Sequence, residues 1–109
     1  MDVFTVLSEP TRRSIVEMVA RHGELTATHI GRRFASSPPA ISQHLKVLLD
    51  AEVLHVEKRG RQRIYRLNVS AINALDAWTA RIKTLWDARL DRLDILLASE
   101  TKSPKNYKK

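Results

Sequence analysis

The stretch SSPPAISQHLKVLLDA, residues 36–51, carries the pattern of one short amphipathic helix. Ser37 suits the N-cap, because its hydroxyl can accept a hydrogen bond from a backbone N–H of the first turn, and Pro38 suits the first helical position. The apolar residues that follow recur every three or four positions, as one face of a helix requires. They are Ile41, Leu45 and Leu48. We therefore predict a helix from Pro38 to about residue 51, with one buried face.

The opposite face of this helix carries side chains that can read DNA. It presents Pro39, Ser42, Gln43 and Lys46, and it is preceded by Ser36 and Ser37. A glutamine can make two hydrogen bonds to the edge of adenine and a serine can bond either kind of base, whereas a lysine suits a phosphate. The alternative is an ordinary solvated face, but such faces are usually richer in Glu and Lys. His44 lies on the flank of the apolar stripe, where a packed role and a DNA contact both stay open.

The residues before this helix predict three further helical segments. The first is brief and lies within residues 2–8. The second has Thr11 as its cap and ends at Gly23, which stops a helix readily. The third covers residues 25–34, and a tight connection joins it to the helix at 38–51. Two short helices joined by a tight turn are the arrangement of a helix-turn-helix.

After residue 52 the helical spacing gives way to a basic hairpin. Residues 53–57 and 62–67 are rich in β-branched and aromatic side chains, and Gly60 lies between them. The cations around this glycine are Lys58, Arg59, Arg61 and Arg63. We call the hairpin at 53–67 the wing and expect these cations to contact DNA, because an arginine on a thin loop can enter a minor groove. The alternative is a solvated hairpin tip, which fits the one-signed charge poorly.

A last, long helix is predicted from Ser70, as its N-cap, to about residue 98. Its apolar positions are Leu75, Trp78, Ile82, Leu85, Trp86, Leu90, Leu93, Leu96 and Leu97. This stripe is longer than a small domain needs for its own core, so we expect part of it to pack on a second copy of the chain. The alternative is a helix that folds back on its own domain. We expect one domain over residues 1–98 and a basic, flexible tail at 99–109.

Composition narrows the class of protein. The chain has 109 residues, a net charge of +7 and no cysteine. The positive charge favours a polyanionic partner such as double-stranded DNA. Without cysteine, a histidine pair at metal spacing or a glycine-rich phosphate loop, an enzyme is disfavoured and we expect no catalytic residues. The first residues do not resemble a signal peptide and no apolar run approaches ~18 residues, so we expect a cytoplasmic protein that makes no membrane contact.

Three motifs resemble those of the ArsR/SmtB family. They are LSEPTRR at residues 7–13, AISQHLKVL at residues 40–48, and RGR with YRL at residues 59–61 and 65–67. The resemblance implies a winged helix-turn-helix repressor, mainly α with a β-hairpin wing, whose recognition helix is the one at 38–51. It also implies a homodimer through the first and last helices, so that Phe4 and Leu7 join the apolar stripe of the last helix.

Two turns depart from the family pattern. Ala35 precedes the recognition helix and Glu52 follows it, at places where the family often has glycine. A glycine after the helix would adopt a left-handed cap readily, so these departures concern local turn geometry and not the fold.

The metal sites of the family have no counterpart in this sequence. The resemblance aligns residues 24–28 with a stretch that carries paired cysteines in many relatives, and both thiols are absent. His22 and His29 are close in sequence, but a bare histidine pair is more often structural than a metal site. We therefore expect no metal and no cofactor. A small-molecule inducer is left open, with Trp78 and Trp86 as one candidate lining and interface packing as their stronger interpretation.

The expected function is sequence-specific regulation of transcription, by a repressor that binds an inverted-repeat operator as a dimer. The alternative is a winged-helix module that binds a protein and has no sequence-specific DNA binding. A salt titration separates the two, because DNA binding weakens steeply as the salt concentration rises.

Overall fold

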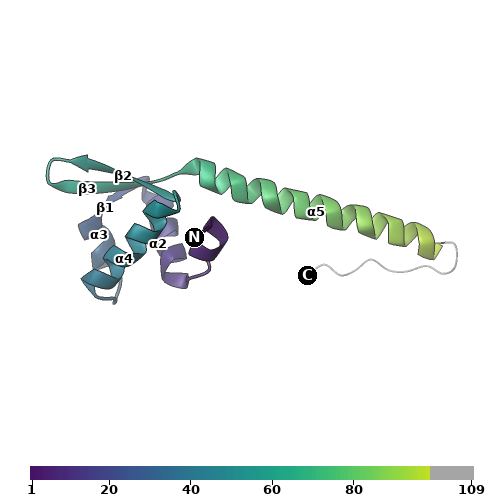
Figure 1. Ribbon diagram of the computed structural model, residues 1–109, viewed down its shortest axis with the longest axis horizontal. Coiled ribbons are helices and arrows are strands. Elements are labelled where there is room, and N and C mark those ends of the chain that lie inside the picture. The colour runs from purple at the N-terminus through teal and green to yellow at the C-terminus, as the bar shows by residue number, and fades with distance from the viewer. Residues whose placement is uncertain (99–109) are drawn as a thin grey trace. The chain divides into compact units, whose positions relative to one another are not determined.

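The computed structural model describes the backbone of residues 1–98 and the side chains of residues 1–94, so the predicted tail at 99–109 lies outside the described residues. In chain order the elements are α1 (Val3–Val6), α2 (Pro10–His22), β1 (Glu24–Thr26), α3 (Ala27–Arg32), α4 (Pro38–Asp50), β2 (Leu54–Arg59), β3 (Gln62–Leu67) and α5 (Val69–Ala98) (Figure 1). This order confirms the predicted class, which is mainly α with a β-hairpin wing. The chain divides into two compact units, and the boundary between Asn73 and Ala74 falls inside α5.

The strands form one antiparallel sheet in the order β1-β3-β2. The strand β1 was not predicted, and the prediction of a helix from Leu25 onward is wrong for its first residues. Residues 24–26 are extended instead, because β1 pairs with β3 and places Leu25 opposite Tyr65. Both side chains are buried. The helix begins only at Ala27, where the Thr26 hydroxyl accepts a hydrogen bond of 3.0 Å from the backbone N–H of His29.

Two predicted helix caps are also corrected. Glu9, and not Thr11, caps α2: its carboxylate accepts a hydrogen bond of 3.1 Å from the backbone N–H of Arg12. Asn68, and not Ser70, caps α5: its side-chain oxygen accepts a hydrogen bond of 3.2 Å from the backbone N–H of Ser70. In both places the capping residue stands earlier in the chain than predicted, so the helix starts earlier as well. The predicted stop of α2 at residue 23 is confirmed, since the glycine there has a φ of 87°.

One apolar core joins α1, α2, α3 and α4 to the sheet. Its most deeply buried members are Val6, Ile15, Val19, Ile30, Leu48, Val53 and Leu54. Each such side chain contributes about 1.5–3 kcal/mol when it leaves water. The predicted apolar face of α4 is confirmed, because Ile41, Leu45 and Leu48 are all buried. This packing orients α4, so its polar face is held towards solvent while the tip of the β2–β3 hairpin extends beyond the helices (Figure 1).

The turn after α4 has a strained backbone. Glu52 has a φ of 60°, in the left-handed region that disfavours a residue with a Cβ atom. Asn68 holds this turn, because its side-chain NH2 donates a hydrogen bond of 2.7 Å to the Glu52 carbonyl. The backbone N–H of Asn68 donates to the Val53 carbonyl at 2.9 Å. Asn68 therefore connects the end of α4, the start of the wing and the first turn of α5.

We expect Glu52→Gly to raise the free energy of unfolding by about 0.5–1 kcal/mol. Removing the Cβ relieves about 1–2 kcal/mol of left-handed strain, and the greater freedom of glycine in the unfolded chain offsets part of that gain. Urea denaturation followed by circular dichroism measures the change. Glu52→Ala is the control, because it removes the charge but keeps the Cβ; equal stabilisation by both substitutions would show that strain is not the cause.

Candidate nucleic-acid interface

The polar face of α4 presents the predicted reading residues together. Ser37 caps the helix, with its hydroxyl oxygen 3.3 Å from the backbone nitrogen of Ala40, and Pro38 occupies the first turn as predicted. The exposed members of the predicted set are Ser36, Ser37, Pro39, Ser42, Gln43 and Lys46. Because Gln43 makes no side-chain hydrogen bond to another described residue, its amide is available for a base edge.

His44 differs from the other predicted contacts, because one of its ring nitrogens is already used. The Arg12 guanidinium lies with Nη1 at 3.2 Å from His44 Nδ1, and the ring is half-buried. A guanidinium has only donors, so Nδ1 accepts and the ring hydrogen resides on Nε2. Of the two roles left open for His44, the structure thus contains the hydrogen-bonded one, and Nε2–H remains as a donor.

Arg12 and Arg13 form hydrogen bonds to the end of α1, which no sequence pattern had indicated. Arg12 Nε donates a hydrogen bond of 2.7 Å to the Val6 carbonyl, and Arg13 Nη1 donates one of 2.7 Å to the Leu7 carbonyl. Both arginines therefore satisfy carbonyl groups at the end of α1. Arg12 also reaches α4 through His44, so it joins the N-terminal helix to the helix that presents Gln43.

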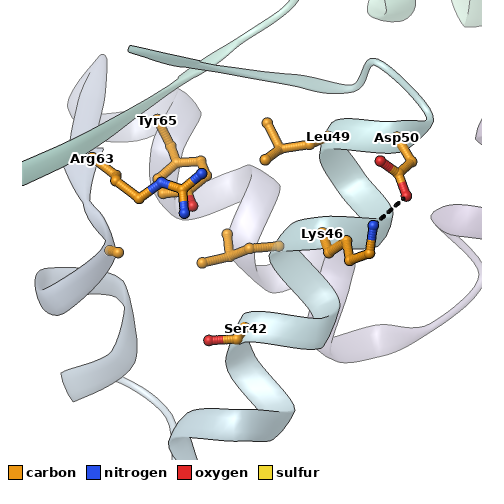
Figure 2. A pocket seen from close by; sticks show the side chains of 8 residues that line it. Ser42, Lys46, Leu49, Asp50, Arg63 and Tyr65 are labelled. Carbon is orange, nitrogen blue, oxygen red and sulfur yellow. Dashed lines mark hydrogen bonds and ion pairs between the residues drawn. The ribbon is translucent and has the colours of Figure 1, made fainter. Parts of the chain in front are cut away.

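The wing has two faces of different charge. The register of β2 and β3 pairs Lys58 with Arg63 and Arg59 with Gln62. Since side chains alternate along a strand, Lys58 and Arg63 share one face, and Arg59 lies on the other. Arg63 and Tyr65 point to the α4 side, where they line a cavity with residues of that helix (Figure 2). Among the described residues, Lys58, Arg61 and Arg63 make no ion pair.

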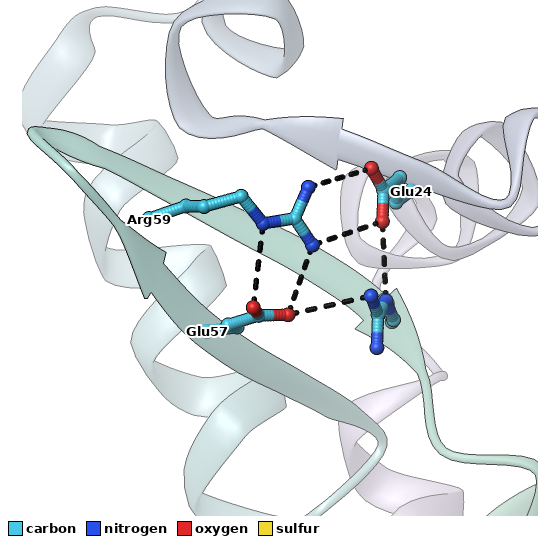
Figure 3. A network of polar contacts seen from close by, with 4 residues as sticks. Glu24, Glu57 and Arg59 are labelled. Carbon is cyan, nitrogen blue, oxygen red and sulfur yellow. Dashed lines mark hydrogen bonds and ion pairs between the residues drawn. The ribbon is translucent and has the colours of Figure 1, made fainter.

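The other face of the wing is electrically balanced. Arg59 lies 3.1 Å from Glu24 and 3.0 Å from Glu57, and Arg66 lies 3.2 Å from Glu24 and 3.3 Å from Glu57 (Figure 3). The hydrogen bond from Arg59, followed by that from Arg66, holds the pKa of Glu24 below its ordinary value. The network therefore stays charged at neutral pH and is lost only as the pH falls through that lowered pKa. Of the four wing cations predicted to contact DNA, Arg59 is the one whose charge is compensated among the described residues.

The cavity between α4 and β3 has a volume of about 460 Å³ and is lined by residues of three elements. Ser42, Lys46 and Asp50 line it from successive turns of α4, and Arg63 lines it from β3. In Figure 2 Ser42 points towards the Arg63 side, whereas the side chains of Lys46 and Asp50 point towards each other on the other side of the helix. Lys46 Nζ lies 3.3 Å from Asp50 Oδ2. Asp50 was not among the predicted contact residues, although its spacing of four from Lys46 is the signal for such a pair.

The apolar stripe of α5 is largely solvent-exposed within the described residues. Ile82, Leu85 and Leu93 are exposed by 43%, 65% and 44%, and Trp78 and Trp86 by 41% and 52%. Leu75 and Leu90 are half-buried. At the other end of the chain, Phe4 is 47% exposed, while Leu7 packs against the core. Leu96 and Leu97 lie outside the residues whose side chains are described.

Two further observations concern metal binding and membrane-spanning helices. The rings of His22 and His29 are 6.0 Å apart between centroids, and His22 Nδ1 lies 2.9 Å from the Met18 carbonyl oxygen. Within the part of the chain that is described, no three His, Cys, Asp or Glu side chains lie close enough to hold a metal ion. No helix in that part is both long and apolar enough to cross a membrane.

Comparison with known proteins agrees with this geometry. A family described as a helix-turn-helix domain matches residues 7–57. The transcriptional repressor SdpR of Bacillus subtilis (strain 168) is 36% identical over 77 residues, which cover 71% of this chain and 84% of that protein. An ArsR-like transcriptional regulator from Rhodococcus sp. RHA1 has a TM-score of 0.76 at 30% identity, covering 86% of this chain and 88% of that one. The structure of an ArsR family transcriptional regulator, RHA00566, has a TM-score of 0.71 at 28% identity and covers 77% and 86%. The chain therefore belongs to the ArsR/SmtB family of winged helix-turn-helix transcription regulators, which are DNA-binding proteins and not enzymes.

Proposed function

We propose that this regulator is a repressor that binds an inverted-repeat operator as a homodimer. The observation that carries the proposal is the outward polar face of α4, which the core fixes next to an uncompensated basic face of the wing. The first surface has the size and chemistry to read base edges in a major groove, and the second has the charge to follow the neighbouring backbone or minor groove. A repressor needs only to occupy its operator.

Within this proposal the residues of α4 have separate roles. Gln43 and Ser42 are the base-reading side chains, and Lys46 contacts a phosphate. Ser36 and Ser37 lie at the start of the helix, where backbone N–H groups suit a phosphate, and Pro39 shapes the surface beside them. His44 donates from Nε2 to the same DNA backbone or base edge.

Two copies of the chain are needed for an inverted repeat. The exposed apolar stripe of α5 is the surface that a second copy covers, and Phe4, which is exposed on α1, is a separate candidate contact of the dimer. A dimer with two-fold symmetry places its two recognition helices about 34–36 Å apart, which is one turn of DNA. Any inducer is a small molecule that acts without thiolate ligands, because the sequence has no cysteine.

Selection of bound sequences from a random pool of duplexes tests the proposal. The expected result is an enriched inverted repeat whose half-sites are about one helical turn apart. Enrichment of a single half-site would overturn the dimeric arrangement, and a pool that stays random while the protein binds would overturn sequence-specific recognition. A protein that binds no duplex at low salt would overturn the proposal as a whole.

We expect Arg61→Ala to weaken DNA binding and to reduce the slope of log affinity against log salt by about 0.9, which corresponds to one phosphate contact. The reason is that Arg61 stands at the tip of the wing with an uncompensated charge. Fluorescence anisotropy over a series of salt concentrations measures the slope. Arg59→Ala is the matched control on the balanced face of the wing, and we expect a smaller change from it. An unchanged slope for Arg61→Ala would remove this residue from the contacts.

A further inference from the structure

The cavity between α4 and the wing lies where a strand of DNA would cross the protein surface. One of its walls comes from α4, with Ser42 and Lys46, and the opposite wall comes from β3, with Arg63 and Tyr65 (Figure 2). In B-form DNA one sugar-phosphate strand separates each major groove from the neighbouring minor groove. If α4 enters the major groove and the wing enters the minor groove beside it, that strand runs between the two elements, over the mouth of this cavity.

The charges at the mouth fit a phosphate with one exception. Lys46 and Arg63 line the space from α4 and β3, and the Lys46 ammonium is directed towards Asp50. Among the described residues that line the cavity, Asp50 is the only one with a carboxylate. It lies 3.3 Å from Lys46, and both side chains remain about two-thirds exposed, at 69% and 68%. Asp50 therefore neutralises the cation that a phosphate would need.

We propose that this cavity binds a DNA backbone phosphate between Lys46 and Arg63. We also propose that Asp50 limits the affinity for DNA of any sequence by holding Lys46 in an ion pair. This inference rests on the proposed DNA-binding function and assigns a site and a regulating residue within it. An exposed ion pair is weak, so Asp50 reduces the share of molecules in which Lys46 reaches the phosphate without preventing that contact.

Asp50 is also placed where its charge does little for the fold. It is the last residue of α4, and the C-terminal end of a helix carries a partial negative charge that disfavours an acidic side chain. The substitution Asp50→Asn keeps the shape of the side chain and removes this charge. We therefore expect the variant to fold at least as well as the wild type, and thermal melting by circular dichroism checks this.

The experiment compares the affinities of the wild type and of Asp50→Asn for two duplexes, the one enriched by selection and a scrambled duplex of the same composition. We expect Asp50→Asn to bind both about three- to tenfold more tightly near 0.1 M salt, with a salt slope steeper by about 0.9, because Lys46 becomes free to neutralise one phosphate. The gain is the same for both duplexes, since a phosphate carries no sequence information.

Two controls distinguish phosphate binding in this cavity from a general effect of net charge. Glu17→Gln makes the same change of charge at an exposed position of α2, and we expect a smaller effect from it. In a Lys46→Met background the gain from Asp50→Asn should be reduced and the steeper slope abolished, because Asp50 acts mainly by holding Lys46. Equal gains from Glu17→Gln and Asp50→Asn, an undiminished gain in the Lys46→Met background, or no gain at all would overturn the inference. Those outcomes leave wild-type binding intact, whereas a wild type that binds neither duplex overturns the proposed function and this inference together.

Discussion

Leu85→Asp is expected to turn the proposed dimer into monomers and to lower operator affinity by about 100- to 10,000-fold, because a monomer loses the gain from engaging two half-sites at once. Leu85 is 65% exposed, the most exposed aliphatic residue of the described stripe on α5. A charged side chain there meets solvent in a single chain and disturbs little. In a dimer the same charge would be buried without a partner, which opposes association strongly.

Sedimentation analysis at micromolar concentration measures the mass of the variant, and an electrophoretic shift assay measures its operator affinity. Ala80→Asp is the matched control, because it adds the same charge on the side of α5 opposite the Trp78 and Trp86 positions. We expect this control to remain dimeric and to bind the operator like the wild type. A Leu85→Asp protein that is still a dimer, or a monomer with full operator affinity, would contradict the proposed assembly.

Gln43→Ala is expected to weaken binding to the selected operator by about 1–3 kcal/mol per contact, which is roughly 5- to 150-fold. Gln43 is exposed in the second turn of α4, and its amide can bond the N6 and N7 atoms of one adenine at once. Alanine removes both hydrogen bonds. The loss should depend on sequence, because the backbone contacts of the protein are unchanged.

A set of operators with single base-pair changes locates the contact. Wild-type affinity should fall at one position of each half-site, and the Gln43→Ala variant should tolerate every base pair there. The affinity of this variant for a scrambled duplex should equal that of the wild type. An equal loss on all duplexes would instead make Gln43 a contact to the DNA backbone.

The recognition helix was predictable because its signals are local. Ser37 and Pro38 start the helix and the apolar residues follow at helical spacing, so the polar face is determined by the same few residues. The stop of α2 at Gly23 is local in the same sense. In each case neighbouring residues alone predict where the helix begins or ends.

The features that sequence analysis missed depend on contacts between distant parts of the chain. β1 exists because residues 24–26 pair with β3, about forty positions later, and no local preference marks so short a strand. The caps at Glu9 and Asn68 were missed because the neighbouring residues Thr11 and Ser70 are of types that often cap a helix, and Glu is not. Only the path of the backbone decides between them.

The wing shows both cases within one hairpin. Alternation along a strand predicts that neighbouring cations, such as Lys58 and Arg59, point to opposite faces. The sequence did not reveal that Glu24, on a strand not predicted at all, would complete an ion-pair network on the face of Arg59. The sequence therefore suggests positive charge on both faces of the wing, whereas in the structure the unpaired positive charge of the described residues lies on the face of Lys58 and Arg63.

The side chain of Asn68 links the turn after α4 to the first turn of α5. Its amide is fastened to the carbonyl of Glu52 on one side and to the opening turn of α5 on the other. Hydrogen bonds stretch little without breaking. If the first turn of α5 rotates, we therefore expect the end of α4 and the start of β2 to move with it. We therefore expect the distance between the polar face of α4 and the basic face of the wing to stay the same while their common orientation changes.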